Sequence, residues 1–364
     1  MRKICIVITN RAPFGRLKSA LRAIQEHPDL ELQLVLAGSM LLEKYGGTEY
    51  IEKDFPVAEK IYTVVEGSTP GCMALTTGLF ITQLTNTFER LKPDVVLVHA
   101  DRYEQLAIAT TAAYMNIKLA HTQGGEISGS IDDKVRNSIS QLADIHFSAT
   151  EQSKQRLINM GCENVYNVGC PSIDIIPKDL SVKEDFFDKY KGVGGRIDCS
   201  YPYIVVLQHP VTTEFGSGTE QIRETIKAIQ ALKMPTVWLW PNVDAGTDEI
   251  SKELRKWREL EKPDYVHFLK NLEPEDYYRL IANCSCLIGN TSSGIREGSF
   301  LGTPYICIGS RQNQRERGRN VLFSEYDRNH IYSAYIEHSS KYGPDYRFGN
   351  STAGKQIADI LAVI

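Results

Sequence analysis

The sequence alternates short apolar runs rich in β-branched residues with longer amphipathic stretches. Short continuous apolar runs predict buried strands, whereas apolar residues recurring every three to four positions predict helices. In the first half, the expected strands are residues 3–9, 32–37, 60–64, 94–99, 118–122, 145–149 and 165–168. The expected helices between them are residues 15–27, 73–91, 102–115, 133–142 and 152–160. This alternation is typical of βαβ units around a parallel sheet.

A second series of the same kind follows a glycine-rich stretch, residues 190–200, which we expect to be a loop. Its expected strands are residues 203–208, 236–240, 265–269, 284–288 and 304–308. Two such series predict an α/β protein with two doubly wound, Rossmann-like domains that face each other across a cleft. We place the domains at residues 1–172 and 173–346, and a last amphipathic helix at residues 353–363.

Composition narrows the class of protein. The 364 residues include 41 Lys and Arg against 45 Asp and Glu, a net charge of −4, so a nucleic-acid partner is not expected. The apolar runs fall far below the ~18 residues that span a bilayer, and the amino terminus has no signal-peptide pattern. The eight cysteines form no CxxC pair. We therefore expect a soluble, cytoplasmic protein without a membrane partner.

Polar side chains gather at the positions where the expected strands end. In parallel sheets, ligands bind beyond the carboxyl ends of the strands, so these positions predict a binding site. The segments are His99–Ala100–Asp101, His121–Thr122–Gln123, Gln208–His209, Pro241–Asn242 and Asn290–Thr291.

The segment GNTSSGIRE, residues 289–297, follows an expected strand and opens an expected helix. Free N–H groups and hydroxyls at such a position can bind the phosphates of a diphosphate. Glu297, one turn inside the expected helix, is placed to accept hydrogen bonds from ribose hydroxyls. The alternative is a plain serine N-cap followed by a structural glutamate. The candidate phosphate-binding residues are Thr291, Ser292, Ser293 and Gly294.

Two arginines are candidates for the positive charge that a diphosphate needs. Arg11 follows the first strand, and Arg311 begins the arginine-rich stretch at residues 311–319. For the second, a solvated surface is the alternative.

Carboxylates cluster after the strands of the first half: Asp101, Glu126, Asp132 and Asp133. Neighbouring acids raise one another's pKa, which favours a general acid or base near neutral pH. The alternative for Asp132 is the N-cap of helix 133–142. His209 is a further acid–base candidate, with a structural histidine as its alternative. HExxH, GxSxG, P-loop and GxGxxG motifs are absent, so we expect no metal site and no dinucleotide cofactor.

Several motifs resemble those of the hydrolysing UDP-N-acetylglucosamine 2-epimerases, including the epimerase half of the bifunctional enzyme of sialic acid biosynthesis. The longest are VHADRYEQLAIATTAAYMNIKLAHTQGGEISGSIDDKVRNSISQLADIHF (residues 98–147) and IGNTSSGIREGSFLGTP (residues 288–304). Shorter ones are GCPSID (169–174), VLQHPVTTE (206–214) and WPNVDAG (240–246). The resemblance extends over essentially the whole length of the chain.

The resemblance implies a glycosyltransferase-B-like fold, in which the carboxyl-terminal segment, residues 347–364, packs back on the first domain and the second domain binds UDP. It implies that UDP is eliminated from a UDP-2-acetamido sugar to give a 2-acetamidoglucal, to which water adds with inversion at C2. The products are UDP and N-acetylmannosamine. The resemblance implies a homodimer or a homotetramer. It implies no cofactor.

By resemblance, Asp101, Asp132 and His209 match acid–base positions, whereas Arg11, Thr291, Ser292, Ser293 and Glu297 match the UDP site. We add Asn242, Gly294 and Arg311 to the candidate UDP-binding set. Gln123 stands where many relatives carry a glutamate, so Glu126 or Asp132 is the alternative acid at this point. Pro13 and Phe14 also depart from the family pattern. Both departures leave UDP-N,N'-diacetylbacillosamine open as an alternative substrate, and a glycosyltransferase of the same fold as an alternative activity.

Overall fold

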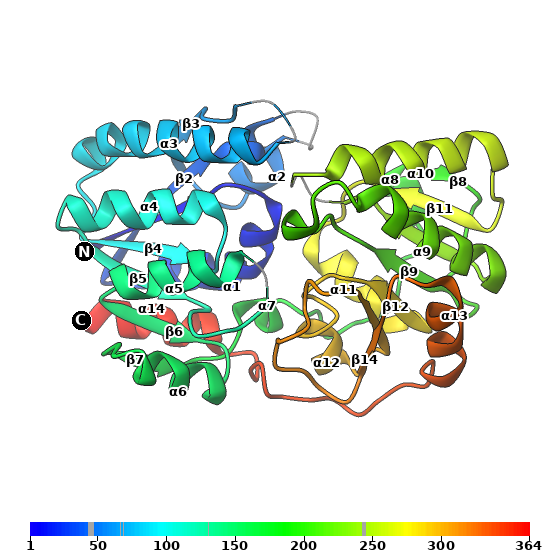
Figure 1. Cartoon of the computed structure of the whole chain (residues 1–364). Helices are drawn as coiled ribbons and strands as arrows, with labels where there is room; N and C mark the ends of the chain where they lie inside the picture. The colour runs from blue at the N-terminus through cyan, green and yellow to red at the C-terminus, as the bar shows by residue number, and fades with distance from the viewer. Residues whose placement is uncertain (43–46, 66, 68, 130, 242–244) are drawn as a thin grey trace. The chain divides into compact units, whose positions relative to one another are not determined.

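The computed structural model describes residues 1–42, 47–65, 67, 69–129, 131–241 and 245–364 (Figure 1). The chain divides into two compact units, which we describe separately. The first contains Met1–Ile127, Ile131–Ile175 and Arg347–Ile364, and the second is built mainly on Ile176–Tyr346.

The first unit contains a seven-stranded sheet in which every pair of neighbours is parallel. Its strand order, β3-β2-β1-β4-β5-β6-β7, reverses direction between β1 and β4. The strands are β1 (Arg2–Ile8), β2 (Leu30–Ala37), β3 (Val57–Ile61), β4 (Val95–His99), β5 (Lys118–Thr122), β6 (Ile145–Ser148) and β7 (Val165–Asn167). The helices are α1 (Arg11–Glu26), α2 (Glu49–Glu52), α3 (Pro70–Leu91), α4 (Tyr103–Tyr114), α5 (Asp132–Leu142), α6 (Glu151–Asn159), α7 (Pro171–Asp174) and α14 (Ala353–Val363).

Alternating side chains of β1 divide between two apolar cores, because successive residues of a strand point to opposite faces of the sheet. Ile4 and Ile6 pack with residues of α1 and α14 on one face. Cys5 and Val7 pack with residues of α3, α4 and α5 on the other. Helices therefore cover both faces of the sheet (Figure 1).

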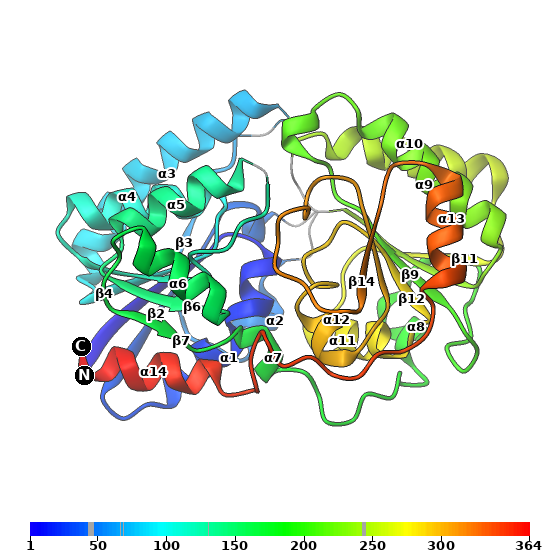
Figure 2. The ribbon, with the colours of Figure 1, turned by 60° about the horizontal axis from the view of Figure 1, so that its bottom comes forward.

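The carboxyl-terminal helix α14 lies against α1 and α7 in the first unit (Figure 2). Asp174, at the end of α7, accepts hydrogen bonds from the backbone N–H groups of Ala353 and Gly354 at 3.2 and 2.7 Å. The Arg2 guanidinium donates to the Leu361 carbonyl at 2.6 Å. The two ends of α14 are thus anchored by polar contacts to distant parts of the sequence.

The second unit contains another seven-stranded sheet, ordered β14-β13-β12-β9-β10-β11-β8, in which only the pairing of β8 with β11 is antiparallel. Its strands are β8 (Val193–Gly194), β9 (Ile204–Leu207), β10 (Thr236–Leu239), β11 (Val266–Leu269), β12 (Cys286–Gly289), β13 (Tyr305–Ile308) and β14 (Val321–Ser324). Its helices are α8 (Phe186–Tyr190), α9 (Gly218–Leu232), α10 (Thr247–Glu261), α11 (Pro274–Asn283), α12 (Glu297–Leu301) and α13 (Arg328–Glu337). The two predominantly parallel sheets confirm the predicted α/β class.

The second sheet differs from the sequence prediction in two ways. Strand β14 was not predicted, and its four residues are all only partly buried. The glycine-rich stretch 190–200 is not simply a loop, since Val193–Gly194 pairs with β11. A Cβ atom on Gly194 would collide with the Val266 carbonyl oxygen, so this glycine permits a close approach of two strands.

Candidate active site

In each unit two of the candidate residues follow the strands between which the strand order reverses, where ligands of open α/β sheets bind. In the first unit Arg11 follows β1, and Asp101 follows β4. In the second unit His209 follows β9, and Thr291 follows β12. Both reversal points therefore carry polar groups that can contact a substrate.

Asp101 is paired with a fully buried arginine that the sequence patterns did not single out. Arg136, on α5, has no exposed surface and donates to the Asp101 carboxylate and, at 2.5 Å, to Asp133. Its guanidinium also donates to the Glu126 backbone carbonyl at 2.7 Å. Burial alone lowers the pKa of Arg136, but Asp101, Glu126 and Asp133 outweigh it and raise the pKa above its ordinary value. The structure thus gathers three of the predicted carboxylates around one permanent positive charge.

His121 fixes the backbone immediately before Asp101. Its Nε2 lies 2.8 Å from the Ala100 carbonyl oxygen, which can only accept, so Nε2 carries the proton. Its Nδ1 lies 3.1 Å from the Ser140 hydroxyl on α5. Burial lowers the pKa of His121 to about 3, so the imidazole is neutral at physiological pH. Ala100 adopts a left-handed conformation (φ +60°), and we attribute the persistence of this strained turn to these contacts.

Asp132 is the first residue of α5, and the residue at the N-cap position is Ile131. The alternative prediction, Asp132 as an N-cap, was therefore wrong: the helix begins one residue earlier than expected and has no side-chain cap. As a first-turn residue, its carboxylate lies where the helix dipole favours negative charge.

Gln123 is buried at the end of β5 and, like Ala100, has a left-handed backbone (φ +62°). Its side-chain amide donates to the Cys170 sulfur at 3.0 Å and accepts from Arg16 at 3.5 Å. Neither contact involves a carboxylate. The amide at this position is therefore oriented by a thiol and a cation.

In the second unit, His209 and Asn290 are joined by two reciprocal hydrogen bonds. The His209 backbone N–H donates to Asn290 Oδ1 at 2.7 Å, and Asn290 Nδ2 donates to the His209 carbonyl at 2.8 Å. Both residues are buried. Asn290 was predicted only to follow a strand, without a role of its own, and its two hydrogen bonds fix the backbone that carries His209.

The hydroxyls after β12 form a connected group. Thr291 Oγ1 lies 3.0 Å from Ser293 Oγ, which also contacts the Tyr277 hydroxyl. The Tyr305 hydroxyl donates to the Thr291 carbonyl at 2.9 Å, and a Cβ on Gly294 would lie 2.5 Å from the Tyr305 ring. The loop therefore rests on an aromatic ring that only glycine can approach this closely.

Glu297 is the first residue of α12, so the prediction that it lies one turn inside a helix was wrong. Residues 292–296 form turns before the helix begins. Glu297 is only 2% exposed, and its Oε2 atom is buried without a hydrogen-bond partner among the described residues. A buried carboxylate oxygen of this kind is costly unless a donor reaches it, and ribose hydroxyls are donors.

The two candidate arginines lie in different settings, Arg11 at the start of a helix and Arg311 in the loop after a strand. Arg11 begins α1, with its guanidinium carbon 5.2 Å from the centre of the Tyr50 ring. Its Nε atom is buried and has no hydrogen-bond partner among the described residues. Arg311, just after β13, donates to the Asn290 carbonyl at 3.4 Å. Asn242 lies outside the described residues.

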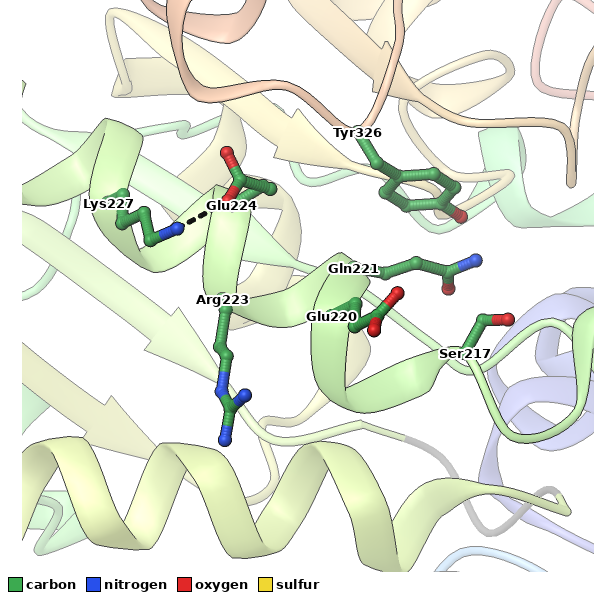
Figure 3. Close-up of a pocket in the computed structure, with 7 residues that line it drawn as sticks. All are labelled: Ser217, Glu220, Gln221, Arg223, Glu224, Lys227 and Tyr326. Carbon is green, nitrogen blue, oxygen red and sulfur yellow. Dashed lines mark hydrogen bonds and ion pairs between the residues drawn. The ribbon is translucent and has the colours of Figure 1, made fainter.

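A pocket of about 530 Å³ in the second unit lies elsewhere, along α9 and beside Tyr326 (Figure 3). Its lining contains none of the residues predicted for the site. Lys227 and Glu224 pair across 2.6 Å within it, and such exposed ion pairs contribute little energy.

Two absences concern the part of the chain that the structure describes. No group of three or more His, Cys, Asp or Glu side chains there is arranged to bind a metal ion. No helix there is long and apolar enough to cross a membrane.

Comparison with known proteins identifies the family. A sequence model of the UDP-N-acetylglucosamine 2-epimerase family matches residues 22–362. A UDP-N-acetylglucosamine 2-epimerase of Neisseria meningitidis is 31% identical over 99% of this chain and 95% of its own length. A hydrolysing UDP-N,N'-diacetylbacillosamine 2-epimerase of Legionella pneumophila is 34% identical over 88% of this chain and 85% of its own.

Solved structures agree on the fold. The UDP-N-acetylglucosamine 2-epimerase of Methanocaldococcus jannaschii, in complex with UDP-GlcNAc and UDP, superimposes with a TM-score of 0.81 at 18% identity, covering 99% of both chains. The Neisseria meningitidis enzyme bound to UDP-GlcNAc gives a TM-score of 0.79 at 17% identity, again covering 99% of both chains. The chain belongs to the UDP-N-acetylglucosamine 2-epimerase family.

Proposed function

We propose that this protein is a hydrolysing 2-epimerase, which converts UDP-N-acetylglucosamine and water into UDP and N-acetylmannosamine. The observation that carries the proposal is the group of carboxylates around the buried Arg136 at the end of β4 and the start of α5. Proton transfer at a carbon next to an acetamido group needs a well-oriented carboxylate, and the Asp101 and Asp133 side chains are held by the same guanidinium.

In the proposed reaction, a carboxylate of the first unit removes the proton from C2, and the C1–O bond to UDP breaks. The product of this step is a 2-acetamidoglucal. A second acid then returns a proton to the opposite face of C2, and water adds its hydroxyl at C1 and gives its remaining proton to the conjugate base of that acid. We assign these two roles to members of the set Asp101, Glu126, Asp132 and His209, without a cofactor.

The second unit binds the leaving group in this proposal. The hydroxyls of Thr291, Ser292 and Ser293 bind the diphosphate, since hydroxyl and N–H donors stabilise charge that develops on a leaving phosphate. Glu297 accepts from the ribose hydroxyls, and Arg311 supplies positive charge. Arg11, in the first unit, is a further candidate for the cation. These hydroxyl and guanidinium donors favour the departure of UDP, because UDP leaves with two or three negative charges.

The relatives differ in the sugar of their named substrates, so the identity of the sugar has less support than the type of reaction. The relatives at 34% and 32% identity are named as hydrolysing 2-epimerases of diacetylbacillosamine nucleotides. The Neisseria relative, at 31%, is named for UDP-N-acetylglucosamine. We propose UDP-N-acetylglucosamine as the substrate and UDP-N,N'-diacetylbacillosamine as the alternative that the departure at Gln123 leaves open.

Incubation in D2O with each nucleotide sugar tests the chemistry and the substrate together. We expect UDP release and N-acetylmannosamine that carries deuterium at C2, detected by mass spectrometry and NMR. UDP release without a C2 label would contradict the elimination. Epimerised nucleotide sugar without free UDP would indicate a non-hydrolysing epimerase, and turnover only after addition of an acceptor would indicate a glycosyltransferase.

A further inference from the structure

The arginine-rich stretch, residues 311–319, is only in part a solvated surface. It follows β13 and leads towards β14, and side chains such as Arg319 are exposed. Gln312 and Arg315, by contrast, are only 2% and 7% exposed. Long polar side chains are seldom buried to this extent without hydrogen bonds. The contacts of these two side chains therefore indicate what the stretch does.

Gln312 bridges a cation and a backbone carbonyl. Its Oε1 accepts from Arg315 Nε at 2.7 Å, and its Nε2 donates to the Asn290 carbonyl at 3.0 Å. A guanidinium only donates and a carbonyl only accepts, so the two contacts fix which way the amide faces. An ionised glutamate at this position would make only the contact with the cation, and a leucine would make neither.

The Asn290 carbonyl belongs to the peptide unit that leads into Thr291. A trans peptide is planar and holds its C=O and N–H on opposite sides, so the bond to the Asn290 oxygen also sets the direction of the Thr291 N–H. Arg311 donates to the same carbonyl at 3.4 Å. Gln312 thereby helps to orient the first N–H group of the loop that we assign to the diphosphate.

The Asn290 side chain fixes the backbone at His209 as well. Asn290 Oδ1 accepts from the His209 N–H at 2.7 Å, and Nδ2 donates to the His209 carbonyl at 2.8 Å. Asn290 has no exposed surface, so bulk water does not compete for these contacts. A displacement of Asn290 would therefore move His209 and Thr291 together.

We propose that Gln312, oriented by Arg315, is a positioning residue of the active site. It acts through Asn290, whose carbonyl sets the Thr291 N–H and whose side chain sets His209. The proposal rests on the roles proposed above for His209 and Thr291, and it requires no contact between Gln312 and the substrate.

Kinetics of Gln312→Leu and Gln312→Glu, with UDP release as the assay, test the proposal. Each variant removes the donor to the Asn290 carbonyl, and we expect kcat to fall about tenfold, as for one buried hydrogen bond, and KM to rise. Arg315→Met keeps this donor but not its orientation, so its loss should be smaller. Arg319→Met is the matched control, because Arg319 is exposed in the same stretch. Wild-type kcat and KM in both Gln312 variants would overturn the proposal.

A double-mutant cycle separates positioning from a general loss of structure. In a His209→Asn protein the imidazole is already absent, so Gln312→Leu should lower kcat by less than it does in the wild type. Only its effect through Thr291 remains there. Losses that multiply would contradict the proposed action on His209. Circular dichroism checks that each variant is folded, and Arg315→Met repeats the cycle without a change at Gln312.

NMR of the histidine rings gives a readout that does not need activity. In protein with isotope-labelled histidine, the signal that disappears in His209→Asn identifies His209. We expect this signal to shift in Gln312→Leu, whereas those of His267 and His330, in the same unit, stay as in the wild type. An unshifted His209 signal would overturn the proposal even in an enzyme that releases UDP. A shifted signal in a protein that releases no UDP would support the positioning contact and contradict the proposed function.

Discussion

Asp101 and Arg136 form an ion pair in which the arginine is completely buried and the carboxylate is 18% exposed. The two residues are 35 positions apart and come from the end of β4 and the second turn of α5. Because the guanidinium also bonds Asp133 and the Glu126 carbonyl, it fixes the position of Asp101 from a rigid helix. The Asp101 side chain therefore keeps some exposed surface although its partner has none.

Asp101→Asn should therefore lower kcat by about 10²- to 10⁴-fold, the usual contribution of a positioned acid or base. An amide is similar in size but cannot exchange the C2 proton. Steady-state UDP release is the measurement. Asp133→Asn is the matched control: it removes a second carboxylate from the same Arg136, and we expect its kcat to stay within about tenfold of wild type. Equal losses in the two variants would assign the effect to Arg136 rather than to Asp101.

Glu297→Gln should separate binding from stability. The wild-type carboxylate is buried with one oxygen unpartnered, so its replacement by a neutral amide should leave the free energy of unfolding unchanged or raise it by about 1 kcal/mol. Affinity for UDP, measured by isothermal titration calorimetry, should fall at least tenfold because a ribose hydroxyl loses a charged acceptor. If stability and affinity fell together, Glu297 would be a structural residue.

Gly294→Ala should displace the hydroxyl-bearing loop after β12. The added methyl would lie 2.5 Å from the Tyr305 ring, and such overpacking typically costs about 1–3 kcal/mol. We expect KM for the nucleotide sugar to rise more than kcat falls, since the loop is assigned to the diphosphate. Gly343→Ala is the control, because its Cβ would have no neighbour within 4 Å. A Gly294→Ala enzyme with wild-type KM would show that the loop does not bind the phosphates.

The candidate strand-end residues could be predicted from the sequence because parallel strands leave their polar residues at one edge of a sheet. His209 and Thr291 follow β9 and β12, as the apolar runs before them indicated. The helix start at Glu297 could not be predicted, since residues 292–296 are turns whose serines and glycine fit a helix N-terminus equally well in sequence.

Arg136 was missed for a different reason. It lies in a helix rich in charged residues, where an arginine is normally exposed. Its burial depends on Asp101, a partner 35 residues away, and no local pattern of apolar and polar residues records such a pairing. The sequence did offer one indication of the pairing. Asp133 and Arg136 are three residues apart, and residues at this spacing lie next to each other on a helix and can form an ion pair.

The neutral, buried His121 makes stability depend on pH. Its pKa is about 3 in the folded protein, lowered chiefly by burial, against an ordinary value of 6.5. The unfolded chain therefore binds a proton below pH 6.5 that the folded chain does not. The stabilisation is complete above pH 6.5 and is lost as the pH falls towards 3, by up to about 1.4 kcal/mol per pH unit. His146, with a pKa of about 4, adds a second contribution of the same sign.

Urea unfolding at pH 7.5, 6.5, 5.8 and 5.0 measures this dependence in a range where few carboxylates titrate. His121→Asn should be less stable than wild type at pH 7.5, because the contacts with Ala100 and Ser140 change. It should lose less stability between pH 6.5 and 5.0, since one proton uptake on unfolding is removed. His330→Asn, in which the replaced side chain is 62% exposed, should keep the wild-type slope. A wild-type slope in His121→Asn would show that His121 is protonated to the same extent in the folded and unfolded states, and that the bond to Ala100 is not formed by a neutral imidazole.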